Sequence, residues 1–324
     1  MNLIGIDIGG TKCAVILGKM SNDGNISVAD KIVYSTSEYP SPYQMLPKFL
    51  DGIKEIVKKQ NLTLKDISSI GISCGGPLDS VSGVIMSPPN LPGWNDVHIV
   101  DFFEKETTVP TAIQNDANAC ALAEWKFGAG RGTRNMIFLT FGTGMGAGLI
   151  LDGKLYSGTN DNAGESGHIR LDNFGPVGYG KAGSFEGFCS GGGIAQLART
   201  RAMEKLQMGE KVSYCNNISD LESITALKVA ESANKGDQLA LGVFETCGSY
   251  LGKGLSVLID ILNPECIVLG SIFVRSGHLL ITALEKTLVE ESLPLARKVC
   301  RILPAKLDEQ IGDIASLSVA ANRL

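Results

Sequence analysis

The sequence has little of what builds disulfide frameworks, zinc sites or nucleic-acid interfaces. It contains only three His, and its eight Cys stand singly, with no Cys-x-x-Cys pair. Unpaired Cys are typical of a reducing compartment, so we expect neither disulfides nor a thiolate metal site. Positive charge is also scarce, because 29 Lys and Arg against 34 Asp and Glu leave a net charge of −5. This balance argues against a duplex nucleic acid or an anionic membrane as the main partner.

Long apolar runs are missing as well. No segment approaches the roughly 20 apolar residues of a membrane helix, and the N-terminus lacks the basic and apolar pattern of a signal peptide. We therefore expect a cytoplasmic protein without membrane spans. With 44% hydrophobic and 19% charged residues, the chain has the composition of a folded protein. Its length of 324 residues suits two domains.

Short apolar runs alternate with helical patterns along the chain, which indicates an α/β protein. The expected strands are 3–8, 13–17, 67–73, 111–114, 136–141, 147–151 and 266–269. The expected helices are 45–57, 117–127, 194–206, 238–262 and 311–324. Pro264 cannot continue a helix, so it marks the end of the fourth one.

A unit of strand, glycine-rich turn and returning strand occurs twice. The first turn is Gly9-Gly10-Thr11-Lys12, and the second is Gly142-Thr143-Gly144-Met145-Gly146. The repeat predicts two lobes of related topology, although two Gly-rich hairpins can also coincide by chance. From the repeat alone we place a smaller lobe at 1–118, completed by the helix 311–324, and a larger lobe at 119–310.

Both turns have the composition of a phosphate-binding loop. Glycine permits positive φ and close approach of the backbone, so that successive N–H groups can point at an anion. Neither turn is a Walker A loop, because Gly-Lys-Ser/Thr is absent and a strand follows. Asp7 precedes the first turn, and its carboxylate could hold magnesium directly or through water. Two ordinary tight turns are the alternative.

Polar residues at three further places have both a structural and a functional interpretation. Asn115-Asp116 could cap the helix that follows, or Asp116 could be a general base where α/β sheets present catalytic groups. Glu165-Ser-Gly-His168 and Glu186 lie in a Gly-rich stretch, where solvated loop residues are the alternative. Asn90-Leu-Pro-Gly-Trp94 could be a surface loop with a packed Trp.

Taken in order, the motifs at 7–12, 90–94, 115–118, 142–146 and 165–168 resemble the ROK family of repressors, open reading frames and sugar kinases. Their order and spacing hold over essentially the whole chain. The resemblance implies a two-lobed, actin-like (ribonuclease H-like) ATPase fold of the α/β class that closes on its sugar, with nucleotide and sugar in the interlobe cleft. It also implies a homodimer, while the net charge of −5 leads us to expect no nucleic-acid partner.

The resemblance further implies ATP-dependent phosphorylation of a hexose-type sugar, glucokinase-like at the 6-hydroxyl, with Asp116 as catalytic base. The implied cofactors are ATP and Mg²⁺, with Asp7 near the metal. The sugar ligands would be Gly76, Asn90, Asn115, Asp116, Glu165, His168 and Glu186. The nucleotide contacts would be Gly9, Gly10, Thr11, Lys12, Thr143, Gly144 and Gly270.

One segment departs from the family pattern. Many members follow the Glu-x-Gly-His motif with Cys-x-Cys-Gly-x-x-Gly-Cys-x-Glu, whose three Cys bind a structural zinc together with the His. Here the Cys positions hold Val177, Tyr179 and Ser184, so we expect no zinc. We expect the loop to be held instead by packing of Phe174, Tyr179 and Phe185.

Three other functions stay open. A sugar-sensing transcriptional regulator would carry an N-terminal helix-turn-helix, which we do not expect because the first strand begins at Leu3. A non-catalytic sugar-binding protein is the second, and a carboxylate kinase of the actin-like superfamily is the third. Asp116 and the two turns favour catalysis, and the motifs at 90–94 and 165–168 favour a sugar. The same residues fit glucose, mannose, fructose, allose and N-acetylated amino sugars.

Overall fold

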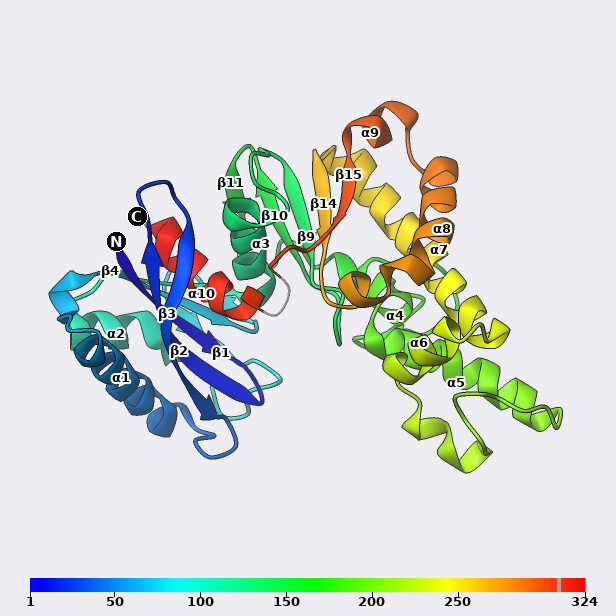
Figure 1. The fold of residues 1–324 in the computed structure, drawn as a ribbon, viewed down its shortest axis with the longest axis horizontal. Coiled ribbons are helices and arrows are strands. Elements are labelled where there is room, and N and C mark those ends of the chain that lie inside the picture. Colours follow the sequence, from blue (N-terminus) through cyan, green and yellow to red (C-terminus); the bar gives the residue numbers. More distant parts are fainter. Residues whose placement is uncertain (308–309, 324) are drawn as a thin grey trace. The chain divides into compact units, whose positions relative to one another are not determined.

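The computed structural model describes residues 1–307 and 310–323. It is a mixed α/β protein with two five-stranded mixed sheets, as the α/β prediction requires (Figure 1). Its strands are β1 (Asn2–Ile8), β2 (Lys12–Met20), β3 (Ile26–Ser35), β4 (Ile67–Cys74), β5 (Leu78–Asp79), β6 (Val84–Ile85), β7 (Val97–His98), β8 (Thr111–Asn115), β9 (Met136–Leu139), β10 (Ala147–Leu151), β11 (Lys154–Tyr156), β12 (Val177–Gly178), β13 (Lys181–Ala182), β14 (Cys266–Leu269) and β15 (Arg301–Pro304).

The helices include four of more than fifteen residues. They are α1 (Pro42–Lys59), α2 (Ile99–Thr107), α3 (Asp116–Phe127), α4 (Phe185–Phe188), α5 (Gly191–Gln207), α6 (Ala226–Asn234), α7 (Gln238–Leu262), α8 (Ile272–Glu291), α9 (Pro294–Val299) and α10 (Ile311–Arg323). Short 3₁₀ helices are η1 (Leu64–Asp66), η2 (Ser166–His168) and η3 (Ile218–Ser223). In the described part of the chain, no helix is both long and apolar enough to span a membrane.

The chain divides into two compact units. The first comprises Met1–Arg134, Gly148–Ala163 and the described residues of Lys306–Leu324, and the second comprises Asn135–Ala147 and Gly164–Ala305. The lobe boundaries expected from the repeat, 1–118 with 311–324 and 119–310, stay a prediction. Residue 324 of that prediction lies outside the described residues.

The first unit contains a sheet with the strand order β3-β2-β1-β4-β8. Strands β1 and β2 form the predicted antiparallel hairpin, whereas β4 lies parallel to both β1 and β8. Helix α1 contacts β2 and β3, and its Met45, Phe49 and Ile53 are fully buried at the helical spacing seen in the sequence. Strand β3 was not predicted, because most of its residues are partly or fully exposed and its apolar pattern is weak.

Helix α10 returns to this sheet from the far end of the chain and contacts β1, β4 and α3. Two glycines make its close packing possible. Gly5 and Gly71 are partners in the parallel register of β1 and β4. A Cβ at Gly71 would overlap backbone atoms of Ser316 and Ala320, and a Cβ at Gly5 would overlap the Ser316 hydroxyl. Small residues on both elements therefore let the backbones approach one another.

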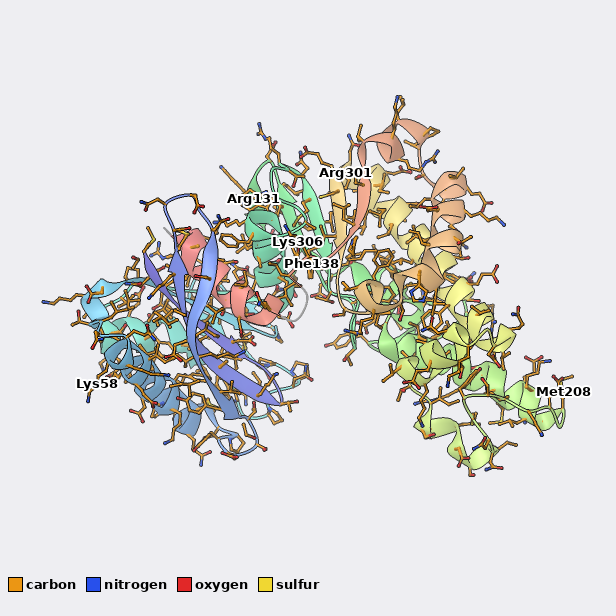
Figure 2. The ribbon with its side chains drawn as sticks, viewed as in Figure 1. Lys58, Arg131, Phe138, Met208, Arg301 and Lys306 are labelled. Atoms are coloured by element: carbon orange, nitrogen blue, oxygen red, sulfur yellow. The ribbon has the colours of Figure 1, made fainter. Side chains whose placement is uncertain are left out.

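The segment that leads into α10 is held by a buried carboxylate. Glu124 of α3 is fully buried, and its Oε1 accepts hydrogen bonds from the amides of Lys306 (2.9 Å) and Leu307 (2.8 Å). Its Oε2 accepts from the amide of Ala129 at 2.7 Å. Three backbone donors compensate for the burial of this charge. Lys306 is labelled in Figure 2.

In the second unit, β14 lies between β9 and β15 and is parallel to both. Helices α7 and α8 make the most extensive helix–helix contact of the unit. Helix α7 begins at the N-cap Asp237 and ends at Asn263 in a left-handed conformation, directly before Pro264, as predicted. Helix α8 was not predicted. Its pattern starts immediately after the strand β14, and non-helical dihedral angles at Ser276 interrupt it.

Candidate active site

The first glycine turn joins β1 to β2 and leaves two amides unused. Gly9 N–H donates to the Lys12 carbonyl at 3.2 Å, and the Thr36 hydroxyl donates to the Gly9 carbonyl at 2.7 Å. The amides of Gly10 and Thr11 donate to no group in the described residues. The two glycines do not use positive φ, contrary to our expectation. Gly10 is instead required by close approach, since a Cβ there would lie 2.9 Å from the Asn90 carbonyl oxygen.

Asp7 is half-buried in β1, two residues before this turn. Burial, and after it the nearby carboxylates of Asp313 and Asp116, raise the pKa of its carboxyl to about 6 against the opposing effect of Lys31 and Lys12. Lys31 is itself paired with Asp313 at 2.5 Å. The site of Asp7 therefore carries an excess of negative charge, which a cation would neutralise.

Asn115 and Asp116 lie where β8 ends and α3 begins. The Asn115 side chain accepts a hydrogen bond from the Asn118 amide at 2.7 Å, so the expected capping function is present. Asp116 is the first residue of α3 and is exposed, and one carboxylate oxygen accepts from the Ala117 amide at 2.8 Å. The surrounding protein still limits the hydration of this carboxylate, which raises the pKa of Asp116.

Two other predicted sugar ligands belong to the same unit. Asn90 is exposed in a loop, while Trp94 of that loop is fully buried and donates its indole N–H to the Pro40 carbonyl at 3.0 Å. The structural interpretation of the loop therefore holds, because the packed Trp94 fixes its backbone, and the sugar contact of Asn90 stays a prediction. Gly76 is exposed after the end of β4.

The second glycine turn is tied to Glu186. The Met145 amide donates to the Glu186 carboxylate at 2.9 Å, and a Cβ at Gly144 would lie 2.8 Å from the same carboxylate. The amides of Thr143 and Gly144 donate to no group in the described residues. As in the first turn, the glycines have negative φ, and the left-handed residue is Phe141 (φ 39°) just before them.

A pocket of about 590 Å³ opens beside this turn in the second unit. Its lining includes Thr143, Gly142 and Ser271, which follows Gly270. It also includes the apolar side chains of Ile224, Leu227 and Phe244. The volume lies within the range of small-molecule and cofactor sites.

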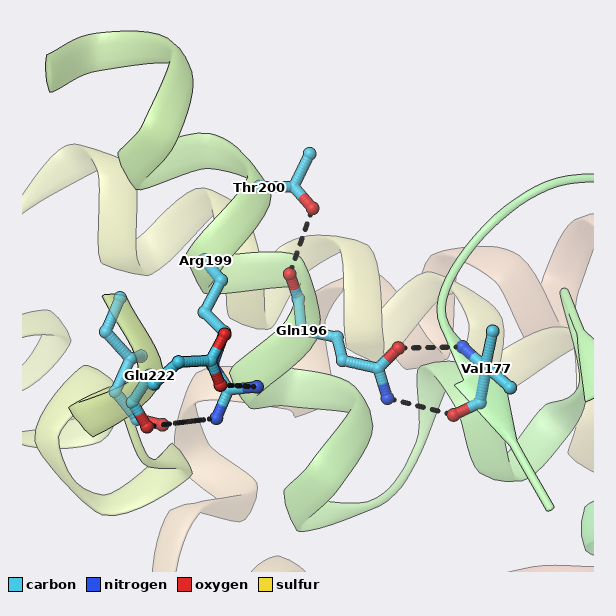
Figure 3. Close-up of polar contacts among 6 residues, drawn as sticks. Val177, Gln196, Arg199, Thr200 and Glu222 are labelled. Carbon is cyan, nitrogen blue, oxygen red and sulfur yellow. Dashed lines mark hydrogen bonds and ion pairs between the residues drawn. The ribbon is translucent and has the colours of Figure 1, made fainter. Parts of the chain in front are cut away.

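An arginine in the wall of this pocket is fixed by several partners. The Arg199 guanidinium contacts the Glu222 carboxylate at 3.2 Å and donates to the Glu222 carbonyl at 3.2 Å (Figure 3). No sequence motif indicated Arg199, and none indicated Arg275, which lines the pocket from α8. Their part in the pocket depends on tertiary packing, although the Gly-Gly-Gly start of α5 was a local signal that could have been used.

Glu165 is the N-cap of the short helix η2, His168 is its last residue, and both are exposed. The Lys181 ammonium donates to the His168 carbonyl at 2.7 Å. The His168 ring lies edge-on to the Tyr179 ring, with 6.3 Å between centroids. The structure therefore brings together His168 and the loop that follows it, and Glu186 lies at the other end of that loop.

Our expectation for that loop was wrong for two of the three aromatic residues. Phe185 is fully buried, but Phe174 and Tyr179 are each 84% exposed. Hydrogen bonds hold the loop instead. The Gln196 side-chain amide accepts from Val177 N–H and donates to the Val177 carbonyl, both at 2.9 Å (Figure 3).

A second contact holds the start of the loop. The Tyr250 hydroxyl donates to the Asp172 carboxylate at 2.5 Å, and the Tyr250 ring stacks on Phe188. Within the described residues, no three His, Cys, Asp or Glu side chains are grouped to hold a metal ion. The expected lack of zinc stays a prediction.

The sequence matches known proteins over its full length. A glucokinase of Halalkalibacterium halodurans is 30% identical over 293 residues, which are 90% of this chain and 86% of that protein. A xylose repressor of Caldicellulosiruptor bescii is 29% identical over 294 residues, which are 90% of this chain and 71% of the repressor. Kinases and regulators are therefore both among the relatives.

Solved structures that share this fold also include a glucokinase. A ROK family glucokinase from Streptomyces griseus, solved in complex with glucose and AMPPNP, has a TM-score of 0.73 and 26% identity, covering 99% of this chain and 100% of that one. This likeness confirms the expected actin-like ATPase fold. The ROK family itself matches residues 3–322. The expected membership is confirmed: this chain belongs to the ROK family.

Proposed function

We propose that this chain is an ATP-dependent kinase of a hexose-type sugar, glucokinase-like in acting on the 6-hydroxyl, with Asp116 as general base. The observation that carries the proposal is the pair of glycine turns, each with two consecutive backbone amides that have no partner in the described residues. Buried or clustered amides without partners are costly unless an anion or water accepts from them. Two such turns in one chain suit a polyphosphate.

The pocket beside the second turn supports a nucleotide as the phosphoryl donor. Its lining includes Thr143, whose amide has no partner in the described residues, and apolar side chains that can cover a base and a ribose. AMPPNP in the related glucokinase is an analogue of ATP. We assign Gly9, Gly10, Thr11 and Lys12 to phosphate contacts in the first unit, and Thr143, Gly144 and Gly270 to nucleotide contacts in the second.

Asp116 is suited to accept the hydroxyl proton. One of its oxygens is oriented by the Ala117 amide, so accepting capacity remains for a sugar hydroxyl. Its raised pKa makes it a stronger base than an ordinary Asp. Phosphoryl transfer has a loose transition state, so orientation of the hydroxyl contributes more than basicity does. We assign this orientation to Gly76, Asn90, Asn115, Glu165, His168 and Glu186.

Asp7 fits a magnesium ion, because its carboxylate is half-buried beside two further acids. Magnesium commonly uses one or two carboxylates and keeps several waters. When bound with ATP it would neutralise phosphate charge. Deprotonated Asp7 is the residue that would hold it, directly or through water.

A sugar-sensing protein without kinase activity is the second candidate, because a xylose repressor is among the relatives. It would use the same sugar ligands and would not need Asp116 as a base. The two candidates therefore differ in turnover and can agree in sugar binding.

The test is ADP release from ATP with a panel of hexoses and N-acetylated amino sugars. We expect one or a few sugars to be phosphorylated, and Asp116→Asn to lower kcat by about 10²–10⁴ while sugar affinity stays nearly unchanged. The raised pKa of Asp116 also predicts that kcat falls on the acid side at a higher pH than an ordinary Asp would give.

Asp237→Ala is the control, since it removes a carboxylate cap at the start of another helix, α7, and leaves every proposed site residue in place. It should lower stability by about 1 kcal/mol and cost far less turnover than Asp116→Asn. Sugar binding without any ADP release in the parent protein would favour the sensor. Full turnover in Asp116→Asn would show that another group accepts the proton.

A further inference from the structure

Tyr179 stands in a backbone conformation that suits other residues better. Strands β12 and β13 are joined by the two-residue turn Tyr179-Gly180, closed by the pair Gly178 and Lys181. Both turn residues have positive φ, 44° at Tyr179 and 74° at Gly180. Such turns favour Asn-Gly, because a bulky side chain is strained at positive φ.

The fold gains no packing in return for this strain. The Tyr179 side chain is 84% exposed and takes no part in the buried core. A large exposed aromatic side chain at a strained position is a feature that binding sites have more often than inert turns do. The neighbouring residues indicate which site this is.

The neighbour of Tyr179 is His168. The two rings meet edge-on with an interplanar angle of 78°, and both are exposed. Lys181, the residue directly after the turn, donates its ammonium to the His168 carbonyl at 2.7 Å. Two contacts therefore hold the Tyr179 turn against the His168 segment. The two hydrogen bonds between the Gln196 side chain and the Val177 backbone fix β12, the other strand of the hairpin.

We propose that Tyr179 is a specificity-determining residue of the sugar site, whose ring is an apolar wall for the C–H face of a pyranose. The inference rests on the proposed sugar site at His168. A pyranose has hydroxyls around its edge and C–H groups on its faces. His168 can bond an edge hydroxyl, while the adjacent aromatic ring covers a face that would otherwise lie against water. The substrate class is accordingly a sugar in its ring form.

The test compares Tyr179→Asn with Tyr179→Phe in the full chain. Asn suits the turn, so this variant removes the ring and relieves the strain, and its melting temperature should equal or exceed that of the parent. We expect the KM for the sugar to rise about 10-fold, which is typical of losing one apolar contact, and the KM for ATP to stay within about 2-fold. Tyr179→Phe keeps the ring and should retain the parent KM for the sugar.

The sugar dissociation constant, measured by calorimetry without nucleotide, should change in parallel. This measurement separates the inference from the proposed kinase activity. If the parent binds sugar but releases no ADP, a 10-fold weaker binding in Tyr179→Asn still supports the role of Tyr179. Unchanged sugar affinity in Tyr179→Asn overturns it, and so does a parent that binds no sugar. A lower melting temperature with both KM values raised would assign Tyr179 to the fold and also overturn it.

Discussion

At the scale of single residues, Asp7 illustrates a carboxylate kept at the expense of stability. Its pKa is raised from 3.8 to about 6, so the folded protein binds this proton more tightly than the unfolded chain does. The contribution of protonated Asp7 to the free energy of unfolding is fully present below about pH 4 and is lost as the pH rises through about 6. Asp7→Asn removes the charge and keeps the shape.

We expect Asp7→Asn to increase the free energy of unfolding by about 1–2 kcal/mol near pH 8 and by almost nothing near pH 4. The full difference in pKa corresponds to about 3 kcal/mol, and partial exposure of the side chain reduces it. Urea unfolding at the two pH values measures the effect. Activity with Mg²⁺ and ATP should fall sharply in the same variant. A variant less stable than the parent near pH 8 would mean that Asp7 is compensated in the folded state.

At the scale of elements, the side-chain amide of Gln196 in α5 bonds both backbone groups of Val177, as a neighbouring strand would. Gln196→Ala removes both of its hydrogen bonds to Val177, each worth about 0.5–1.5 kcal/mol net of the exchange with water. We expect amide hydrogen exchange across 171–184 to become about 10-fold faster, because about 1–2 kcal/mol of local stability is lost. Exchange in α7 should not change.

Thr200→Ala is the matched control on the same helix. The Thr200 hydroxyl donates to the Gln196 backbone carbonyl at 3.1 Å and takes no part in the hydrogen bonds between Gln196 and Val177. Exchange across 171–184 should stay at the parental rate in this variant. Equal rates in Gln196→Ala and the parent would show that the Tyr250 to Asp172 contact is sufficient to hold the loop.

The helices and strands that could be predicted from the sequence are those marked by residues adjacent in the chain. The hairpin of β1 and β2, the end of α7 at Pro264 and the start of α3 after Asn115 each depend on residues adjacent in the chain. Strand β3 was missed because most of its residues are partly or fully exposed, and helix α8 was missed because its pattern starts directly after β14 and is interrupted at Ser276.

The residues of the candidate site also divide into those that a local motif predicted and those that only the structure revealed. Its glycine turns and Asp116, the acidic residue at the start of α3, were found from motifs, since phosphate-binding and capping geometry require particular residues in succession. Arg199 and Gln196 had no such signal, because each acts through a tertiary contact with a segment distant in sequence. The exposure of Phe174 and Tyr179 was also beyond sequence reasoning, which assigns aromatic residues to a core by default.

At the scale of the whole molecule, the proposed function without zinc predicts a specific response to chelation. Purified protein should contain far less than one zinc per chain by elemental analysis. After EDTA treatment and removal of the chelator, the melting temperature should be unchanged, and activity should return fully with Mg²⁺ alone. A structural zinc contributes on the order of 10 kcal/mol, so its removal could not pass unnoticed. About one zinc per chain, lost together with stability, would contradict the prediction.

The position of α10 has a consequence for synthesis on the ribosome. The glycine face of β1 and β4 emerges early, but the helix that covers it is made more than 200 residues later. Residues 164–305 of the second unit can collapse while this face is still bare, so the earliest strands wait for α10. A message cut short before codon 311 would therefore yield a chain whose first sheet stays open and prone to association, even with every proposed site residue present.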